Sequence, residues 1–366
     1  MVNITLFPGR YIQGLDAIQT LPDECARLGS HAFILASPGS RANLLGRVLA
    51  ALESRGRAMV QTFGRQCSDE AITELSQLCR KAGCDIVVGM GGGKTLDTAK
   101  AVARQGKLPC IMIPTIASTD APCSSICVVY TEAGEFKRAD VLPRNPDVVI
   151  VDTRIMAEAP PRFLVSGMGD ALATRFEADS CRKGNAPNIA GAPGSMTAYA
   201  LARLCYDTLL EHGPQALEAA RAQSVTPALE RIVEANTLLS GLGFESAGLA
   251  AAHSIHNGLT ALPQTNAYYH GEKVAFGTLA SLFLTGRHPD EIDEVYGFCE
   301  AVGLPTTLAD IGLDGVSDPD LLRVAEKACA PGESMHNEPF DTAPTRVAAM
   351  LRAANVRGQE RRNRPA

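Results

Sequence analysis

Three of the seven histidines lie close together in the chain, at His253, His256 and His270. His253 and His256 are three residues apart and therefore share one face of a helix. His270 opens a second apolar stretch, from which it can converge on the same point. Catalytic metal sites commonly use three protein ligands and leave one position open. This pattern indicates a metal centre, although histidines on helices also occur as ordinary polar side chains.

A carboxylate is the ligand that this set still needs. Asp170, in "GMGDALATRFEA", follows two glycines in an otherwise apolar segment. Burying an unpaired aspartate there would be costly, and a bound metal would remove that cost. The alternative interpretation is that Asp170 caps the N-terminus of a helix.

A second kind of chemistry is indicated by residues 84–103. The apolar run "CDIVVGM" (84–90) predicts a buried strand, and "TLDTAKAVA" (95–103) predicts a helix. Four glycines between Gly89 and Gly93 let the backbone approach a ligand, and the helix start offers free N–H groups to a phosphate. We expect a pyrophosphate cradle, with a tight turn that binds nothing as the alternative.

Neither standard phosphate motif fits this segment. The P-loop pattern needs a glycine where Val88 stands, and the dinucleotide fingerprint needs its third glycine where Lys94 stands. The segment therefore predicts a third kind of phosphate cradle.

The loop "PTIASTDAPCSS" (114–125) follows the next apolar run and concentrates hydroxyl groups around one aspartate. Open α/β sheets bind ligands at the carboxyl ends of their strands. Thr115, Ser118 and Ser124 are therefore candidates to bond a cofactor, and Asp120 to contact a substrate. An ordinary polar loop is the alternative.

The elements that position these residues follow from hydrophobic periodicity. Apolar runs at 31–37, 59–63, 84–89, 108–114 and 147–152 predict strands, and helical patterns at 41–56 and 69–83 alternate with them. This alternation predicts a parallel sheet with covering helices. Residues 125–143 have two alternating runs around "TEAGE", which predict a hairpin at the sheet edge.

Beyond residue 155 strand patterns almost vanish and long helical patterns dominate. The sequence thus predicts a Rossmann-like α/β domain over 1–155 and an all-α domain over 156–366, which is also the architecture of dehydroquinate synthase. A cleft between two such domains is the expected active site.

Composition excludes several classes of function. The net charge of −6 gives no support for nucleic-acid binding, and no apolar run approaches the roughly 20 residues of a membrane span. The eleven cysteines are dispersed without a CxxC pair, and the first residues lack a signal-peptide pattern. We expect a cytoplasmic protein with reduced thiols.

Five motifs in order resemble the glycerol dehydrogenase branch of the iron-containing (group III) alcohol dehydrogenases. They are "GGGKTLDTAKA", "PTIASTDAPCS", "GMGDALAT", "GLAAAHSIHNGLTAL" and "YYHGEKVAFGTL". The likeness runs from residue 8 to residue 337 and is weakest around 181–195.

The resemblance implies a role for each matched residue. Asp170, His253 and His270 would hold the metal, Asp120 and Phe244 would face the substrate, and His256 would lie beside the metal as a proton relay. The implied NAD contacts are Ser37, Gly91, Gly92, Gly93, Lys94, Asp97, Thr115, Ser118, Ser124, Ile126 and Tyr130. Related enzymes of this kind use Zn²⁺, other branches use Fe²⁺, and they commonly form homo-oligomers such as octamers.

One position departs from the family pattern. Similar enzymes carry an aspartate after the first strand, where it can bond the adenosine ribose, and this chain has Ser37. A carboxylate repels a 2′-phosphate, whereas Ser37 does not, and Ser40 and Arg41 could bind one. NAD is the expected cofactor, with NADP as the alternative.

The activity that the resemblance implies is reversible, NAD-linked oxidation of glycerol to dihydroxyacetone, with hydride leaving a metal-bound alkoxide. The alternatives are another vicinal diol such as 1,2-propanediol, a dehydroquinate synthase-like lyase, a polyol-phosphate dehydrogenase, or an inactive binding protein. The lyase and the phosphate dehydrogenase need basic residues to hold a phosphorylated substrate, and the helical region has no obvious cluster beyond His270 and Lys273.

Overall fold

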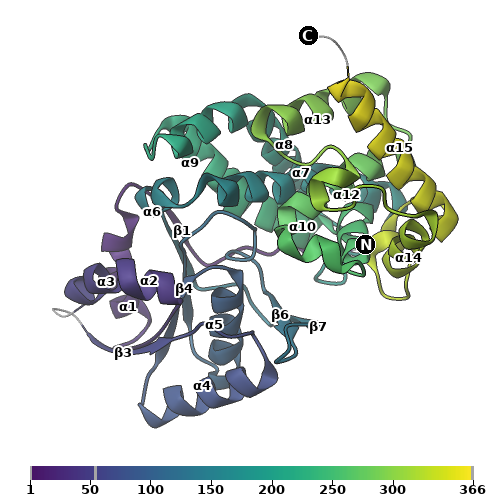
Figure 1. The fold of residues 1–366 in the computed structure, drawn as a ribbon. Helices are drawn as coiled ribbons and strands as arrows, with labels where there is room; N and C mark the ends of the chain where they lie inside the picture. Colours follow the sequence, from purple (N-terminus) through teal and green to yellow (C-terminus); the bar gives the residue numbers. More distant parts are fainter. Residues whose placement is uncertain (1, 53–55, 364–366) are drawn as a thin grey trace. The chain divides into compact units, whose positions relative to one another are not determined.

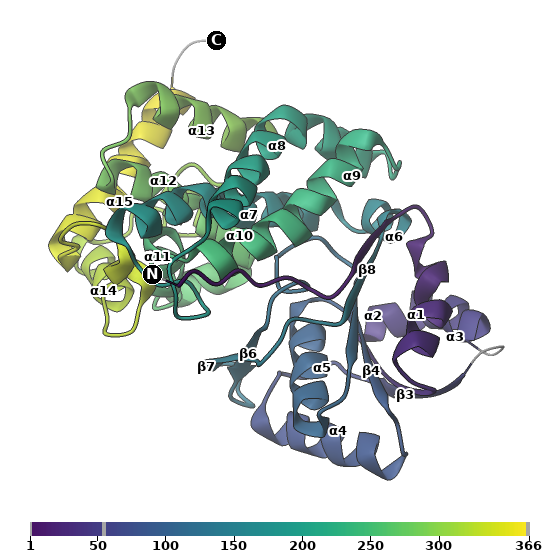
Figure 2. The same ribbon diagram turned by 180° about the vertical axis from the view of Figure 1, so that it is seen from behind.

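The computed structural model describes residues 2–52 and 56–363, and these form two compact units (Figures 1 and 2). The sheet unit consists of Leu6–Pro160 and Ala219–Gly241. The helical unit consists of Pro161–Glu218 and the described parts of Met1–Thr5 and Leu242–Ala366.

A parallel sheet of six strands, in the order β1-β8-β5-β4-β2-β3, is the frame of the sheet unit. Five of these strands overlap the five runs predicted as strands, whereas the short β1 was not predicted. The six are β1 Tyr11–Gly14, β2 His31–Ala36, β3 Arg57–Thr62, β4 Ile86–Gly91, β5 Cys110–Pro114 and β8 Val148–Asp152.

Helices cover both faces of this sheet. On one face, Ile34 of β2 and Val88 of β4 pack in a single buried cluster with Leu21 of α1 and Val48 of α3. On the other face lies α5, beside which α4 runs (Figure 2). The helices of this unit are η1 Ala17–Thr20, α1 Leu21–Leu28, α2 Pro38–Asn43, α3 Leu45–Leu52, α4 Asp69–Lys81, α5 Gly93–Gly106, α6 Thr153–Glu158, α9 Pro227–Glu234 and the π-helical turn η2 Ala235–Leu239.

Two local predictions need correction. The helix predicted over 41–56 is divided into α2 and α3 at Leu44, and its part at 53–55 lies outside the described residues. The predicted hairpin exists as β6 Ile126–Tyr130 and β7 Phe136–Val141, but it forms its own two-stranded antiparallel sheet. It does not extend the edge of the main sheet, whose described edge strands are β1 and β3.

Helices build the whole of the helical unit, as the sequence predicts, so the α/β-then-α fold class is confirmed. They are α7 Pro161–Gly184, α8 Met196–Arg221, α10 Ser240–Ala247, α11 Ala251–Leu259, η3 Pro263–Ala267, α12 His270–Leu284, α13 Pro289–Val302, η4 Leu308–Ile311, α14 Asp318–Ala328, η5 Ser334–Asn337 and α15 Pro344–Arg362.

The compact units differ from the predicted boundary between residues 155 and 156. Residues 219–241 are mostly helical, and their helical pattern assigned them to the second domain, but they pack within the sheet unit. Tyr11 of β1, for example, bonds Thr237 through its hydroxyl at 2.8 Å.

None of the helices in the described residues is long and apolar enough to cross a membrane. All eleven cysteines are free thiols.

Candidate functional site

Three helices of the helical unit meet through glycines, and this close approach creates the candidate metal centre. A Cβ added to Gly271 at the start of α12 would lie 1.7 Å from the backbone oxygen of Ser166 in α7. A Cβ on Gly277 would lie 2.5 Å from the backbone oxygen of Ala252 in α11. Glycine is the residue that permits such contact between helix backbones. The side chains next to these crossings are therefore forced together.

Those neighbouring side chains are the three predicted ligands. His253 of α11 and His270 of α12 point their Nε2 atoms at Oδ1 of Asp170 in α7, at 3.3 and 3.0 Å. One ligand atom from each residue can be chosen so that all three lie within 4.8 Å of one another. Asp170 is in the middle of α7, so the alternative reading of it as a helix cap is wrong.

The electrostatics of this cluster are those of a cation site. Asp170 is 1% exposed, so its carboxylate is held away from water and faces the two imidazole Nε2 atoms. Burial opposes the charge, but His270 and His253 outweigh it and bring the pKa of Asp170 below its ordinary value. Burial also opposes the charge of His253. The carboxylates of Glu177 and Asp170 outweigh this effect and raise the pKa of His253 well above its usual range. A divalent metal would satisfy the aspartate and both Nε2 atoms together.

Two further side chains, Glu177 and His256, contact the outer nitrogens of the two histidine ligands. Glu177, on α7, lies 2.6 Å from Nδ1 of His253. His256 Nε2 lies 3.1 Å from Nδ1 of His270, and its own Nδ1 lies 3.0 Å from Oδ1 of Asn257. Burial, followed by the charges of His270 and Lys273, lowers the pKa of His256 well below its ordinary value.

The sequence contains a signal for Glu177, one of these two partners. Glu177 is seven residues after Asp170, which is about two helical turns, so both carboxylates lie on the same face of an apolar helix. His256 was predicted beside the metal without ligating it, and the structure places it against His270.

The predicted phosphate cradle is formed in the sheet unit between β4 and α5. Gly92 is the N-cap of α5, and no side chain caps this helix end, so its first backbone N–H groups face outward. A Cβ on Gly93 would meet nothing closer than 3.9 Å, which leaves open space over the helix start. This is the geometry that an anionic phosphate requires.

Predicted cofactor contacts from three strand ends surround this cradle. Ser37, after β2, lies against Gly91, whose added Cβ would be 2.9 Å from the Ser37 Cβ. The Thr115 backbone N–H bonds the Gly91 oxygen at 3.1 Å. Lys94 holds its ammonium 5.2 Å from the ring centre of Tyr130. The structure thus brings these residues together at the carboxyl end of the sheet.

Two predicted residues have protein partners that limit their role. The Asp97 carboxylate pairs with Lys100 at 2.9 Å and accepts the Val128 backbone N–H at 3.1 Å, so it is occupied in holding β6. Asp120 accepts a hydrogen bond from the Ser240 hydroxyl at 2.7 Å, which orients its carboxylate.

Lys100, which was not among the predicted site residues, fixes the loop between β5 and β6. Its buried ammonium donates to the backbone oxygens of Ala121, Ser124 and Ile126. The predicted contacts Ser118 and Ser124 belong to this loop and are largely buried, and Ile126 begins β6. Phe244 is buried in α10, which places it in the core of the helical unit.

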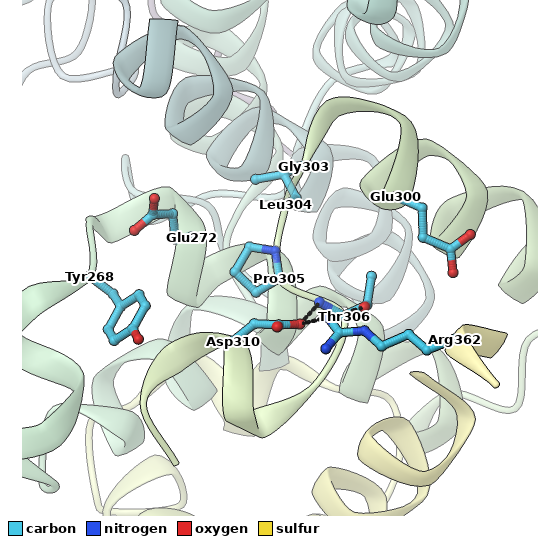
Figure 3. Close-up of a pocket in the computed structure, with 9 residues that line it drawn as sticks. All are labelled: Tyr268, Glu272, Glu300, Gly303, Leu304, Pro305, Thr306, Asp310 and Arg362. Carbon is cyan, nitrogen blue, oxygen red and sulfur yellow. Dashed lines mark hydrogen bonds and ion pairs between the residues drawn. The ribbon is translucent and has the colours of Figure 1, made fainter. Parts of the chain in front are cut away.

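The helical unit also contains a pocket of about 450 Å³ (Figure 3). Tyr268 and Glu272 line one side, and Asp310 and Arg362 form an ion pair on the other. Its other acidic residues, Glu272 and Glu300, form ion pairs with Arg162 and Arg361. None of the predicted site residues lines the pocket, so we assign it no part in the chemistry.

Comparison with known proteins gives the family of the chain. A family model described as iron-containing alcohol dehydrogenase matches residues 8–153. The chain is 60% identical to the glycerol dehydrogenase of Thermotoga maritima over 99% of this chain and 100% of that protein. It is 42% identical to a glycolaldehyde reductase of Halobacterium salinarum over 100% of both chains.

A solved structure gives the same relationship. The glycerol dehydrogenase of Schizosaccharomyces pombe superposes with a TM-score of 0.93 at 36% identity, over 98% of this chain and 92% of that one. The predicted family is confirmed: this chain belongs to the iron-containing alcohol dehydrogenase family.

Proposed function

We propose that this oxidoreductase catalyses the reversible oxidation of glycerol to dihydroxyacetone with reduction of NAD⁺. The observation that carries the proposal is the buried carboxylate of Asp170, at whose Oδ1 the Nε2 atoms of His253 and His270 both point. The names of the relatives, which are chiefly glycerol dehydrogenases, support the same substrate.

In this proposal Asp170, His253 and His270 hold one divalent metal. Such a metal supplies Lewis-acid polarisation of an alcohol oxygen, which lowers the pKa of the alcohol and favours loss of its proton. One carboxylate and two imidazoles suit both Zn²⁺ and Fe²⁺. We propose Zn²⁺, with Fe²⁺ as the alternative.

The chain's own residues bind and orient the reactants. The backbone N–H groups at the start of α5 and the Lys94 ammonium would neutralise the cofactor pyrophosphate. Asp120, whose orientation is fixed by Ser240, would accept a hydrogen bond from a glycerol hydroxyl. Bound NAD⁺ would supply the hydride acceptor, so that glycerol would give dihydroxyacetone, NADH and one proton.

The contacts of His256 support a role in orienting His270 more than the predicted role as a proton relay. If His270 binds the metal through Nε2, its proton is on Nδ1, and it donates to Nε2 of His256. His256 then donates from Nδ1 to Asn257. We therefore propose that His256 orients His270.

The proposal takes NAD over NADP for a structural reason as well. The Ser37 hydroxyl caps α2 by accepting the Ser40 N–H and lies 2.7 Å from the Ser40 hydroxyl. Arg41 bonds the Thr62 hydroxyl at 2.5 Å. The three residues that could bind a 2′-phosphate therefore already have partners.

A second substrate class follows from the relative named as a glycolaldehyde reductase. Reduction of glycolaldehyde gives a vicinal diol, so it is the same chemistry in reverse with one carbon fewer. The predicted 1,2-propanediol activity belongs to this class. The expected homo-oligomer, of which an octamer is the predicted form, remains a prediction that light scattering on the purified chain can test.

The test uses metal-stripped protein supplied in turn with Zn²⁺ and Fe²⁺. Initial rates are measured with glycerol and with 1,2-propanediol, using NAD⁺ and NADP⁺ in parallel, and with glycolaldehyde and NADH in the reverse direction. We expect activity to return with one metal, with the highest kcat/KM for glycerol and NAD⁺.

Two results would contradict the proposal. A higher kcat/KM for 1,2-propanediol or for glycolaldehyde would replace glycerol as the principal substrate. Absence of activity with every metal and cofactor would remove the dehydrogenase assignment for this chain.

A further inference from the structure

We infer that Glu177 is a positioning residue of the metal centre, which holds His253 as the tautomer that leaves Nε2 free for a metal. The inference rests on the proposed function only in requiring a metal at Asp170, His253 and His270. Glu177 has no role in the proposed reaction itself, and the inference gives this buried acidic side chain a role in positioning a ligand.

The contacts of Glu177 are divided between the backbone and the ring of the same helix. Oε1 accepts the backbone N–H groups of Ala250 and His253, each at 2.9 Å. Oε2 lies 2.6 Å from Nδ1 of His253. The side chain of Glu177 is 2% exposed, so water does not compete for these bonds.

The hydrogen-bond chemistry of these contacts selects one tautomer. A carboxylate only accepts hydrogen bonds, so the Nδ1 atom facing it must carry a proton. In neutral imidazole the other nitrogen, Nε2, then has a free lone pair, and it is Nε2 that faces Asp170 at 3.3 Å. Second-sphere carboxylates of this kind orient metal-binding histidines and raise their basicity.

The position of Glu177 in α7 connects it with the ligand Asp170. The two residues are seven apart on one helix, and both are almost completely buried. Because seven residues are about two helical turns, a single face of α7 presents both carboxylates toward α11 and α12. One helix thus supplies a ligand and the group that orients a second ligand.

A second buried glutamate at the same helix end provides a matched control. Glu338 accepts the backbone N–H of Ala251 at 3.1 Å, so it too binds the N-terminus of α11. The contacts that the structure gives for Glu338 do not include the ring of His253. Loss of Glu338 therefore tests the removal of a buried acceptor at this helix end and from Ser180, whereas loss of Glu177 tests capping together with ring orientation.

The informative change is Glu177→Gln, which keeps the size of the side chain. If the amide oxygen keeps accepting the two backbone N–H groups, the NH₂ group faces Nδ1 and donates to it. The proton of His253 then moves to Nε2, where it blocks metal binding. If the amide is flipped, two backbone donors meet an NH₂ group, and the helix end loses its acceptor.

The measurement is the Kd for Zn²⁺, determined on metal-stripped full-length chain at pH 8 by competition with a chromophoric chelator. We expect Glu177→Gln to bind Zn²⁺ roughly 10- to 100-fold more weakly than the wild type. Glu338→Gln should stay within about threefold of the wild type, a difference of less than about 1 kcal/mol. Thermal unfolding of the metal-free variants checks that both are folded.

Two results would overturn the inference: wild-type affinity in Glu177→Gln, or an equal loss in Glu338→Gln. If Glu177→Gln does not fold, Glu177→Asp replaces it, because this variant keeps an acceptor but withdraws it from the ring, and weaker Zn²⁺ binding is again expected. Failure of the wild type to bind Zn²⁺ would overturn the inference together with the metal site. Weak binding by Glu177→Gln in a chain that oxidises no diol would remove the proposed function and leave the assignment of Glu177 intact.

Discussion

At the scale of single residues, buried carboxylates decide the character of the helical unit. Asp170, Glu177 and Glu338 are all less than a tenth exposed, yet their environments differ. Asp170 faces two imidazoles, Glu177 binds a helix end and a ring, and Glu338 binds one backbone N–H group and the Ser180 side chain. A buried carboxylate is costly unless its charge is compensated, and Glu338 has the weakest compensation of the three.

Glu338 should therefore make the stability of the protein depend on pH. Burial raises its pKa from 4.5 to about 7. Because the folded-state pKa is the higher one, its contribution to stability is fully present below about pH 4.5 and is lost as the pH rises through about 7. The loss amounts to at most about 3 kcal/mol.

Glu338→Gln removes this titration and retains an oxygen that can accept the Ala251 N–H. The difference in free energy of unfolding, variant minus wild type, should increase from pH 5 to pH 8. Urea unfolding of both proteins at several pH values measures it. A constant difference across this range would show that Glu338 does not titrate there.

At the residue scale, residue type and spacing were sufficient to select three side chains that lie together in the structure. Asp170, His253 and His270 were chosen for their chemistry, and the structure brings them together. Glu338 had no comparable signal, because its partner Ala251 is 87 residues earlier in the chain. A hydrogen bond to a backbone N–H depends on the path of the chain and leaves no pattern in residue types.

At the scale of elements, the closeness of α7 and α12 is what brings Asp170 and His270 within reach of one ion. The start of α12 contacts α7 at Gly271, where a Cβ would be 1.7 Å from the Ser166 backbone oxygen. A glycine at this point is a requirement of packing, since no larger residue fits without separating the helices.

Gly271→Ala should therefore force the two helices apart. We expect a loss of about 1–3 kcal/mol in the free energy of unfolding, together with weaker Zn²⁺ binding, because His270 precedes the altered residue. Denaturant unfolding and chelator competition measure these effects.

The matched control for this change is Gly297→Ala, inside α13, where the nearest atom to an added Cβ is 3.9 Å away. This control should gain up to about 1 kcal/mol in stability through helix propensity. Equal stability of the two variants would disprove the packing role of Gly271.

At the scale of the whole molecule, the predicted phosphate cradle and the predicted metal ligands belong to different compact units. The cradle between β4 and α5 belongs to the sheet unit, whereas Asp170, His253 and His270 belong to the helical unit. Each set is complete in its own unit, so we expect damage to one to leave binding at the other largely unchanged.

Two substitutions should separate cofactor binding from metal binding. Gly93→Asp places a negative charge over the open cradle, where it repels pyrophosphate by roughly 1–3 kcal/mol, while an acidic residue in the first helical turn is compatible with folding. Asp170→Asn removes the anionic metal ligand. We expect Gly93→Asp to weaken NADH binding about tenfold or more and to leave the Kd for Zn²⁺ within twofold. Asp170→Asn should do the reverse.

NADH binding is measured by the fluorescence of the nicotinamide, which is convenient because the chain has no tryptophan. A large loss of NADH affinity in Asp170→Asn would show that the two sites are not independent.

The sequence by itself determined most of the helices and strands, the fold class, and the types of residue at the candidate sites. Hydrophobic periodicity reports which face of a helix or strand is buried, and this information is local. Glycine runs, a histidine pair on one helix face and an aspartate in an apolar segment likewise report local needs, and with the resemblance to a known family they were sufficient to predict the metal ligands and the phosphate cradle.

The tertiary structure alone decided which groups hold these ligands in place. It placed residues 219–241 with the sheet, formed the hairpin of β6 and β7 as a separate sheet, and used Asp97 in an ion pair with Lys100. It also placed Glu177 on His253 and His256 on His270. Glu177 and His253 are 76 residues apart in the chain. The energies of all these contacts depend on distance and burial, which arise only when the chain is packed.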